Sequence, residues 1–417
     1  MLSLGQVFFS CVLGLRHSLA STMQFPNSAG LRMAVVIAAA ALDPIAMPVL
    51  RAAEVAVGRH LRVGPGLTYK TPSAAAAAAK DGDTVEIEAG DYPGDVAVWS
   101  ASRLTLRGTN GRVYLAANGN SAQQKAIWVI RGSDTTVENI EFSGCRVADR
   151  NGAGIRHEGK GLVVRHCSFH DNEDGILTGA NPASDILVEF SEFAHNGAGD
   201  GYSHNIYIGQ VRSFTLQFCA SRQVKTGHLV KSRAQTNFIL YNRLMDEQDG
   251  SSSYVIDLPN GGRSIIIGNI IQHGPHAENG VAVSYAAEGA KNLVQELYVV
   301  NNTYINERPA TAGFLRVAGS PPIVRVVNNI ITGTHSVLSG PGQSSNNLVT
   351  EPAVFVDAAH GDYRLAPRSP ALGAGIDPGK AGGFNLMPNV YYRHPLGSAP
   401  RPAAAPPDLG ACPAGGS

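Results

Sequence analysis

The chain has few cysteines, few charged residues and few aromatic side chains. Its five cysteines show no CxxC pair and no metal-ligand spacing, so we predict neither a disulfide framework nor a zinc module. Charged residues make up only 16% of the chain, and 33 basic residues balance 33 acidic ones. Because no net charge attracts a polyanion from a distance, we expect no nucleic-acid partner, and any binding of an acidic polymer must be local.

Long apolar runs are also missing, which argues against a stable membrane span. The apolar stretches Leu2–Leu15 and Met33–Leu50 are too short or too interrupted to cross a bilayer as a helix. Each contains or adjoins an arginine and is followed by small residues, as in a secretory leader. We therefore predict that residues 1–60 are a leader, disordered or cleaved, and that the protein is secreted or periplasmic.

Glycine is abundant, at 47 residues, and the middle of the chain repeats itself. Eight short segments between Val137 and Ile331, among them VENIEF and VNNIIT, share one polar or aromatic position at steps of 24 to 33 residues. That position is Asn139, His166, Phe190, Phe218, Asn242, Asn269, Asn302 and Asn329. Such a period predicts a solenoid of strands, whose coils bury their apolar faces only when they stack. We interpret the asparagines as a buried structural ladder.

The segment before the repeat predicts a cap for the open end of the solenoid. Thr71-Pro72-Ser73 precedes an alanine run up to Lys80, which is typical of a short helix with proline in its first turn. The arrangement of residues 61–99 resembles the first segment of the pectate-lyase-like right-handed parallel β-helix superfamily. The resemblance implies an all-β, single-domain right-handed parallel β-helix over residues 61–375. Residues 376–417 form a Pro-, Ala- and Gly-rich tail, in which we expect disorder from about Ala399.

A second strand can be traced in each coil, and its alternation predicts which side chains face outward. One outward column should contain Arg156, Leu177, Tyr207, Lys231 and Asp257. The flanking columns should contain Asn205, Leu229 and Val255 on one side, and Gly209, Arg233 and Pro259 on the other.

Two neighbouring coils then bring reactive side chains together, about 5 Å apart per coil. The predicted catalytic residues are Lys231, Arg233, Tyr207, His204 and His228. The enlarged turn at residues 196–201 is suited to wall a groove beside them. The predicted substrate-binding residues are Asn205, Arg156, Asp257, Glu247 and Asp249.

Each of these side chains also has an ordinary structural interpretation. Lys231 and Arg233 could form a solvated strand edge that deters aggregation. The two histidines could be hydrogen-bonded corner residues, and Tyr207 could pack across coils. Their clustering in one place favours a functional interpretation.

A strip of Tyr, Lys and Arg suits β-elimination from a uronic-acid polysaccharide. Removal of the C5 proton builds negative charge on the adjacent carboxylate, which a cation must neutralise while an acid protonates the leaving oxygen. We assign the base to Lys231, whose neutral form the charge of Arg233 would favour, and the carboxylate contact to Arg233. Tyr207 or a histidine would be the acid. The strip is similar in residue types to that of polysaccharide lyases and uronan epimerases of the superfamily.

Two other functions remain open at this point. A glycoside hydrolase similar to polygalacturonases would need two carboxyl groups, which Asp257 with Asp246, Glu247 or Asp249 could supply. A non-catalytic adhesin would only hold the acidic polymer. We expect a monomer without a cofactor, although a calcium ion bound through Asp246, Glu247 or Asp249 stays open.

Overall fold

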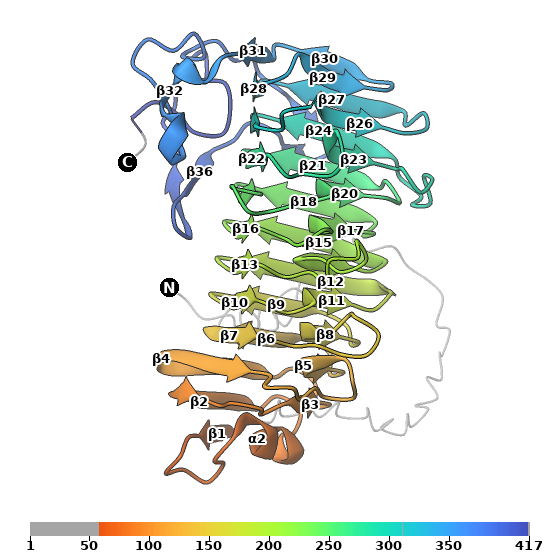
Figure 1. The fold of residues 1–417 in the computed structure, drawn as a ribbon, viewed down its shortest axis with the longest axis vertical. Helices are drawn as coiled ribbons and strands as arrows, with labels where there is room; N and C mark the ends of the chain where they lie inside the picture. Colours follow the sequence, from red (N-terminus) through yellow and green to blue (C-terminus); the bar gives the residue numbers. More distant parts are fainter. Residues whose placement is uncertain (1–57, 311, 416–417) are drawn as a thin grey trace, which may run out of the picture. The chain divides into compact units, whose positions relative to one another are not determined.

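The computed structural model describes residues 58–310 and 312–415, and the predicted leader lies almost entirely outside these residues. The described chain winds into coils of short parallel strands (Figure 1). Most coils contribute one strand to a ten-stranded sheet and two strands to a 21-stranded sheet that bends around the other two faces. The prediction of an all-β parallel β-helix is confirmed.

The ten-stranded sheet carries the side chains of the predicted site. Its strands are β3 (Ala97–Trp99), β5 (Ala126–Ile130), β8 (Ala153–His157), β11 (Asp174–Thr178), β14 (Ile206–Ile208), β17 (His228–Ser232), β20 (Tyr254–Leu258), β23 (Val281–Tyr285), β26 (Gly313–Val317) and β29 (Ser336–Ser339).

The 21-stranded sheet closes the coils. One of its faces contains β1 (His60–Val63), β2 (Thr84–Asp91), β4 (Thr105–Ala116), β6 (Thr135–Glu138), β9 (Leu162–Arg165), β12 (Asn181–Glu189), β15 (Val211–Gln217), β18 (Thr236–Leu240), β21 (Arg263–Ile267), β24 (Glu296–Val300), β27 (Ile323–Val327) and β30 (Gln343–Ser345). The long strand β4 continues into the other face, with β7 (Ile140–Ser143), β10 (Ser168–His170), β13 (Glu192–Ala194), β16 (Ala220–Arg222), β19 (Arg243–Met245), β22 (Ile270–His273), β25 (Thr303–Asn306), β28 (Ile330–Thr332) and β31 (Leu348–Thr350).

Helix α2 (Pro72–Ala78) covers the first coil, as predicted. The Thr71 side chain accepts a hydrogen bond from the Ala74 amide, and Pro72 occupies the first turn, where no intrahelical donor is needed. The helix packs against β1 and β3, and Ala75 is fully buried. Small alanine side chains let the helix lie close to the apolar end of the coil.

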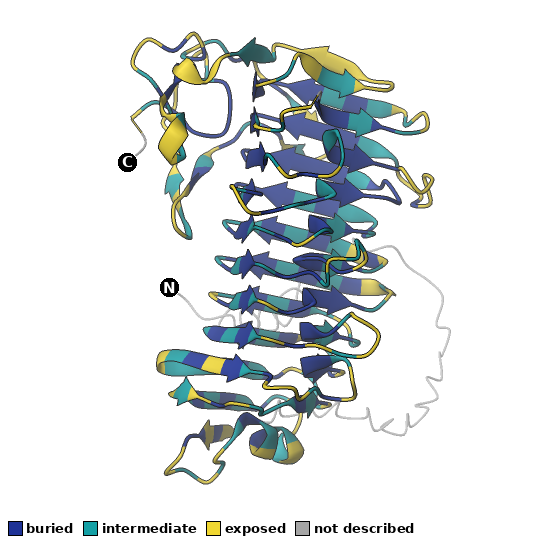
Figure 2. Cartoon of the chain, viewed as in Figure 1, coloured by how far each residue is buried: buried dark blue, intermediate teal, exposed yellow. Residues whose placement is uncertain are grey.

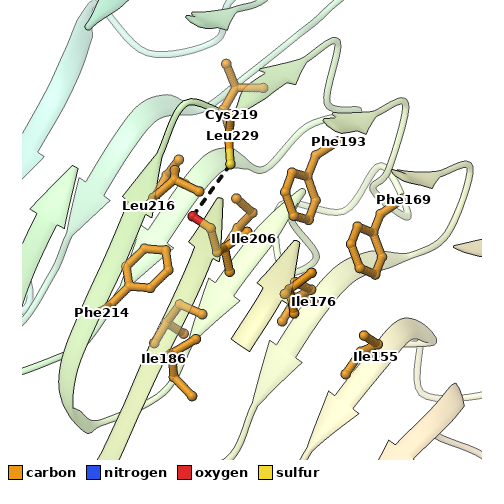
Figure 3. Close-up of a cluster of buried hydrophobic side chains, with 14 of the residues drawn as sticks. Ile155, Phe169, Ile176, Ile186, Phe193, Ile206, Phe214, Leu216, Cys219 and Leu229 are labelled. Atoms are coloured by element: carbon orange, nitrogen blue, oxygen red, sulfur yellow. Dashed lines mark hydrogen bonds between the residues drawn. The ribbon is translucent and has the colours of Figure 1, made fainter. Parts of the chain in front are cut away.

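Apolar side chains fill the interior of the coils. Figure 2 shows that the strands of the coils consist largely of buried residues. Phe142, Phe169 and Phe193 stack along the axis with ring centroids 5.0 and 4.9 Å apart, and isoleucines of the ten-stranded sheet face them (Figure 3). Because each ring contacts its copies in the coils above and below, no coil is stable alone.

The predicted asparagine ladder is present and buried. The Nδ2 of Asn242 donates to Oδ1 of Asn269, that of Asn269 to Asn302, and that of Asn302 to Asn329, at 3.0, 2.9 and 3.0 Å. The amides thereby satisfy one another and the turn backbone inside the solenoid, which confirms their structural role.

The predicted alignment of the first four segments with the last four is wrong by one residue. The rings of Phe190 and Phe218 stack outside the corner and continue onto Tyr241, whereas Cys219 lies beside Asn242 and its amide donates to Oδ1 of that residue. Each corner has an outer residue with positive φ followed by an inner one. The outer position has positive φ at Phe190, Phe218 and Tyr241, and also at Asn301 and Asn328. The hydrogen-bonded ladder is formed by the inner position alone, from Asn242 onward.

The C-terminal segment is ordered where we expected disorder. Leu386, Leu409 and Ala411 are 0, 4 and 1% exposed, and the segment covers the apolar outer face of β18, β21 and β24. The amide of Ala411 donates to Thr303 Oγ1 in a coil of the solenoid. An uncovered apolar sheet face accounts for this packing, which composition alone did not reveal. The segment contains η1 (Pro352–Val354), η2 (Ala358–His360), β32 (Phe355–Asp357), β33 (Asp362–Leu365), β34 (Lys380–Ala381), β35 (Phe384–Asn385), β36 (Val390–Arg393) and β37 (Gly397–Pro400).

Within the described residues, no helix is both long and apolar enough to span a membrane.

Candidate active site

The predicted outward column exists on the ten-stranded sheet. Arg156 pairs with Leu177, Leu177 with Tyr207, Tyr207 with Lys231, and Lys231 with Asp257 in successive parallel strands. Strand pairing therefore brings these five side chains into one line along the solenoid. We name Tyr207, Lys231, Arg233 and Asp257 the central cluster.

Lys231 lies in the middle of the central cluster, with 13% of its side chain exposed. Its Nζ is 3.7 Å from Asp257 Oδ2 and 3.9 Å from an oxygen of Glu288, and 5.5 Å from the centre of the Tyr207 ring. These ion pairs place a cation beside Tyr207. Both distances exceed hydrogen-bond length, so the ammonium can still donate to a ligand.

Arg233 is held in place by several acceptors. Its Nε donates to Tyr207 Oη at 3.1 Å, Nη1 donates to Asn260 Oδ1 at 3.0 Å, and both Nη atoms pair with Glu288 at 2.8 and 3.0 Å. The hydrogen bonds from the Arg233 guanidinium lower the pKa of the Glu288 carboxyl. Since most of its five N–H groups are engaged, Arg233 is better suited to position Tyr207 than to hold a substrate carboxylate, the role that we expected.

Glu288 and Asn260 are the members of the site that sequence analysis missed. Glu288 follows β23 in the turn of the coil between Asn269 and Asn302, where the repeat step of 33 residues is the longest of the series. An insertion of that size marks a loop able to fold back over the sheet. The long step was therefore the available signal.

His204 and His228 lie beneath the cluster rather than on its surface. They are 1 and 5% exposed, and their rings stack with centroids 4.6 Å apart. Nδ1 of His204 accepts from the His228 amide, and Nδ1 of His228 accepts from the Tyr254 amide. Burial lowers the pKa of His228 to about 3, and also places the pKa of His204 well below its ordinary value. Both are therefore neutral, and their burial favours the structural interpretation.

The expectation that Asn205, Leu229 and Val255 face outward is wrong. All three are 0% exposed. Nδ2 of Asn205 donates to Ser221 Oγ and to the Arg222 carbonyl, so this amide holds a corner and cannot reach a substrate. Alternation fails because the chain turns into the strand at these positions, where two consecutive residues point inward.

Glu247 does not border the central cluster. It lies 3.8 Å from Arg222 and lines a separate groove with His394. Asp249 is exposed in the same turn, and no contact joins it to the cluster among the described residues. Asp246 is buried, and its oxygens accept from Ser252 and from the Gly274 amide. These three carboxylates do not form a shared ligand set, and the described residues contain no group of three or more His, Cys, Asp or Glu that could hold a metal ion.

Asp257 is the buried acid of the cluster. Its side chain is 5% exposed, and Oδ2 lies 3.4 Å from His228 Nε2. Burial raises the pKa of the Asp257 carboxyl to about 6, although the charge of Lys231 opposes this shift. The carboxyl is therefore ready to gain or lose a proton in the mildly acidic range.

We expect Asp257→Asn to remove a pH-dependent cost of folding. A carboxyl whose pKa is raised in the folded state favours folding below its unfolded pKa of about 4, and this contribution is lost as the pH rises to about 6. The unfolding free energy of the variant relative to the wild type should therefore increase by about 2–3 kcal/mol from pH 4 to pH 7. Urea unfolding at several pH values measures this difference. A difference that does not change with pH would contradict the raised pKa.

A groove adjoins the cluster on the side toward the N-terminus. Arg156, Leu177, Tyr207 and Arg233 line it, together with Tyr202, which directly follows the enlarged turn. Residues 196–201 themselves do not line it, so the expectation that this turn walls the groove is not met, whereas Arg156 does line it.

Comparison with known proteins identifies relatives of the fold. The family model of the right-handed β-helix region matches residues 99–204. Pectate lyase B of Paenibacillus amylolyticus is 26% identical over 117 residues, which cover 26% of this chain and 29% of that relative. The chain thus matches less than a third of that relative's length. The crystal structure of pectate lyase Pel9A superposes with a TM-score of 0.57 at 14% identity, covering 87% of this chain and 98% of that one. This likeness shows the fold.

Proposed function

The chain has the right-handed parallel β-helix fold of the pectate-lyase-like superfamily, and from this premise we propose that it is an exported lyase of acidic polysaccharides. The single observation that carries the proposal is the outward alignment of Tyr207 with Lys231, while Arg233 donates to the tyrosine oxygen. A phenol and an ammonium then face one bound sugar from adjacent coils. We propose that the protein acts as a monomer.

Each side chain of the cluster has a step in the elimination. The Tyr207 oxygen, in its phenolate form, takes the proton from C5 of the uronate, and Arg233 stabilises the negative charge on that oxygen through its N–H. Lys231 neutralises the charge that develops on the substrate carboxylate. The C4–O4 bond then breaks as the C4–C5 double bond forms, and Tyr207 returns the proton to the leaving oxygen. The enzyme ends in the state in which it began.

This scheme moves the base from Lys231, where we expected it, to Tyr207. The two carboxylates within 4 Å of Nζ pair with Lys231 as an ammonium, and an ammonium cannot accept a proton. Tyr207 lies beside Lys231 in the adjacent strand, and the N–H of Arg233 that its oxygen accepts favours negative charge on that oxygen. Asp257 and Glu288 would hold the ammonium in position until the substrate carboxylate arrives.

A second candidate, a glycoside hydrolase, is favoured by one observation. The pKa of Asp257 is raised by burial, whereas that of Glu288 is lowered by Arg233. Hydrolysis requires one carboxyl group that is protonated and one that is ionised, and such a difference in pKa favours that pairing. Glu288 takes the place of the acids near residue 247 that we expected. The low exposure of Asp257 ranks this candidate second.

One assay separates the candidates. The protein is incubated with polygalacturonate, alginate and glucuronan, and both the ultraviolet absorbance of unsaturated ends and the reducing ends are followed. A lyase produces unsaturated ends, a hydrolase produces reducing ends without them, and an adhesin or an epimerase produces neither. Epimerisation is detected from the sugar composition by NMR. The absence of unsaturated ends with every polymer would contradict the lyase.

We expect Lys231→Ala to form product about 10²–10³-fold more slowly, because the developing carboxylate charge loses its cation. Binding of the polymer should be retained, since Arg156 remains in the groove. Initial rates and equilibrium binding are measured on the same preparations. If weaker binding of the polymer accounts for the whole loss of rate, Lys231 only attracts the polymer and has no catalytic role.

A further inference from the structure

A second set of polar side chains lines the groove that adjoins the central cluster, over β8 and β11. We name this the arginine groove and define it by Arg150, Arg156, Asp174, Leu177, Tyr202 and Tyr207. Asp149 also lines its edge. The elimination described above uses only Tyr207 from this set, so the remaining residues need a separate explanation.

The Arg156 guanidinium is incompletely matched by the protein. Its Nε is buried without a hydrogen-bond partner and lies 3.8 Å from Glu158. Glu158 already pairs with Lys125 at 2.5 Å and with Arg131 at 3.4 Å, so its charge is shared among three cations. The Arg156 side chain as a whole is 26% exposed, so an anionic ligand in the groove can pair with the guanidinium, whose charge the protein matches only in part.

Asp174 lies at the floor of the same groove and is 1% exposed. Its Oδ1 accepts from the His204 amide at 2.7 Å, whereas Oδ2 is buried without a partner. Burial raises the pKa of this carboxyl well above its ordinary value, which favours its protonated form. In that form the carboxyl does not repel an anion bound in the groove.

The surface between Arg156 and Tyr207 suits a sugar ring. Leu177 lies between them in the outward column, 6% exposed and packed beside Tyr207 in a small apolar cluster. Tyr202 forms the rim and is 83% exposed. Arg156 is two coils from Tyr207, a separation of about 9–10 Å. A polymer lying along the column would therefore reach both residues with different sugar units.

We propose that the arginine groove is a uronate-selecting subsite, in which Arg156 binds the carboxylate of a sugar unit next to the one that reacts at Tyr207. The inference rests on the proposed function and extends it. The substrate is then a chain of consecutive free uronates rather than a polymer with isolated or esterified ones. Arg156 is a specificity-determining residue and takes no part in the proton transfer.

The test compares free and esterified ligands on matched variants. In a Tyr207→Phe background, which prevents turnover, calorimetry measures the Kd of trigalacturonate, trimannuronate and triguluronate, and of the methyl ester of the trisaccharide that binds best. Arg156→Gln is the test variant. Arg131→Gln is its control, because Arg131 contacts the same Glu158 but does not line the groove.

We expect Arg156→Gln to weaken binding of the free trisaccharide about 10-fold or more, the loss of a charged hydrogen bond. Binding of the methyl ester should change less than about 3-fold, and Arg131→Gln should leave both affinities as they were. Equal weakening of both ligands, or no weakening, would overturn the subsite. If thermal unfolding shows that Arg156→Gln is misfolded, Arg156→Lys carries the same comparison, with a smaller but still ester-dependent loss expected.

The outcome is independent of the lyase assay. If Arg156→Gln selectively loses affinity for the free trisaccharide while the wild type forms no unsaturated product, the subsite is supported and the lyase activity is refuted. If unsaturated product forms but Arg156→Gln shows no selective loss of affinity, the lyase activity is supported and the subsite is refuted. A wild-type protein that binds none of the free trisaccharides would refute the subsite directly.

Discussion

Tyr207→Phe is expected to lower kcat for elimination by about 10²–10⁴-fold while changing substrate binding less than about 3-fold. The substitution removes one oxygen, the atom that takes the C5 proton and returns it to the leaving group, and proton transfer by a positioned side chain contributes rate factors of this size. The aromatic ring remains, so packing against His204, at 5.1 Å between centroids, is retained. Initial rates and Kd for the same polymer separate the two effects.

The control for this prediction is Tyr202→Phe. Tyr202 is a tyrosine of the same groove but is 83% exposed, and it takes no part in the proton transfer. We expect its kcat to remain within about 3-fold of the wild type, since only a solvated hydroxyl is lost. If Tyr207→Phe retains full kcat, the proton must be carried by another group. Asp257, with a pKa of about 6, would then be the next candidate.

Asn302→Ala should have the largest effect on stability, lowering the free energy of unfolding by about 3–5 kcal/mol. Its Nδ2 donates to the Ile266 carbonyl and to Asn329, and its Oδ1 accepts from the backbone and side chain of Asn269. Each buried partner left without a hydrogen bond costs about 1–3 kcal/mol, and water cannot enter an interior position that is 0% exposed. Urea unfolding followed by circular dichroism measures the loss.

Asn347→Ala provides the matched control at the end of the same ladder. Asn347 accepts from Asn329 in the same way, but it is only partly buried, so water can replace the missing amide. We expect a loss of about 1 kcal/mol. Equal losses at the two positions would mean that burial does not determine the strength of the ladder, contrary to our account of the corner.

The fold could be predicted from the sequence because the coils repeat one physical requirement. Each coil must return to the same corner, where a buried amide pairs with its copies, and the repeat of asparagine at 27 to 33 residues records this directly. The alignment that we predicted at Phe218 was wrong by one residue, for a physical reason. Two adjacent corner positions carry similar periodicity, and only hydrogen bonding and stacking distinguish the inner one from the outer one.

The site could be predicted in part. Alternation along a regular strand was enough to align Tyr207 with Lys231, and Lys231 with Asp257. The same rule failed for Asn205 and Leu229, because backbone that turns into a strand does not alternate. The strand pattern was therefore reliable only in the middle of each strand.

By itself the sequence determined the solenoid, its helical cap and the shared column of Tyr207 and Lys231, because these follow from local periodicity and the constant spacing of stacked coils. Only the tertiary structure decided that Glu288 closes on Arg233, that His204 is buried and that the C-terminal segment covers the sheet. These contacts join residues far apart in the chain, and they depend on how loops fold back over a surface. The repeat in the sequence therefore carries no information about these loop contacts.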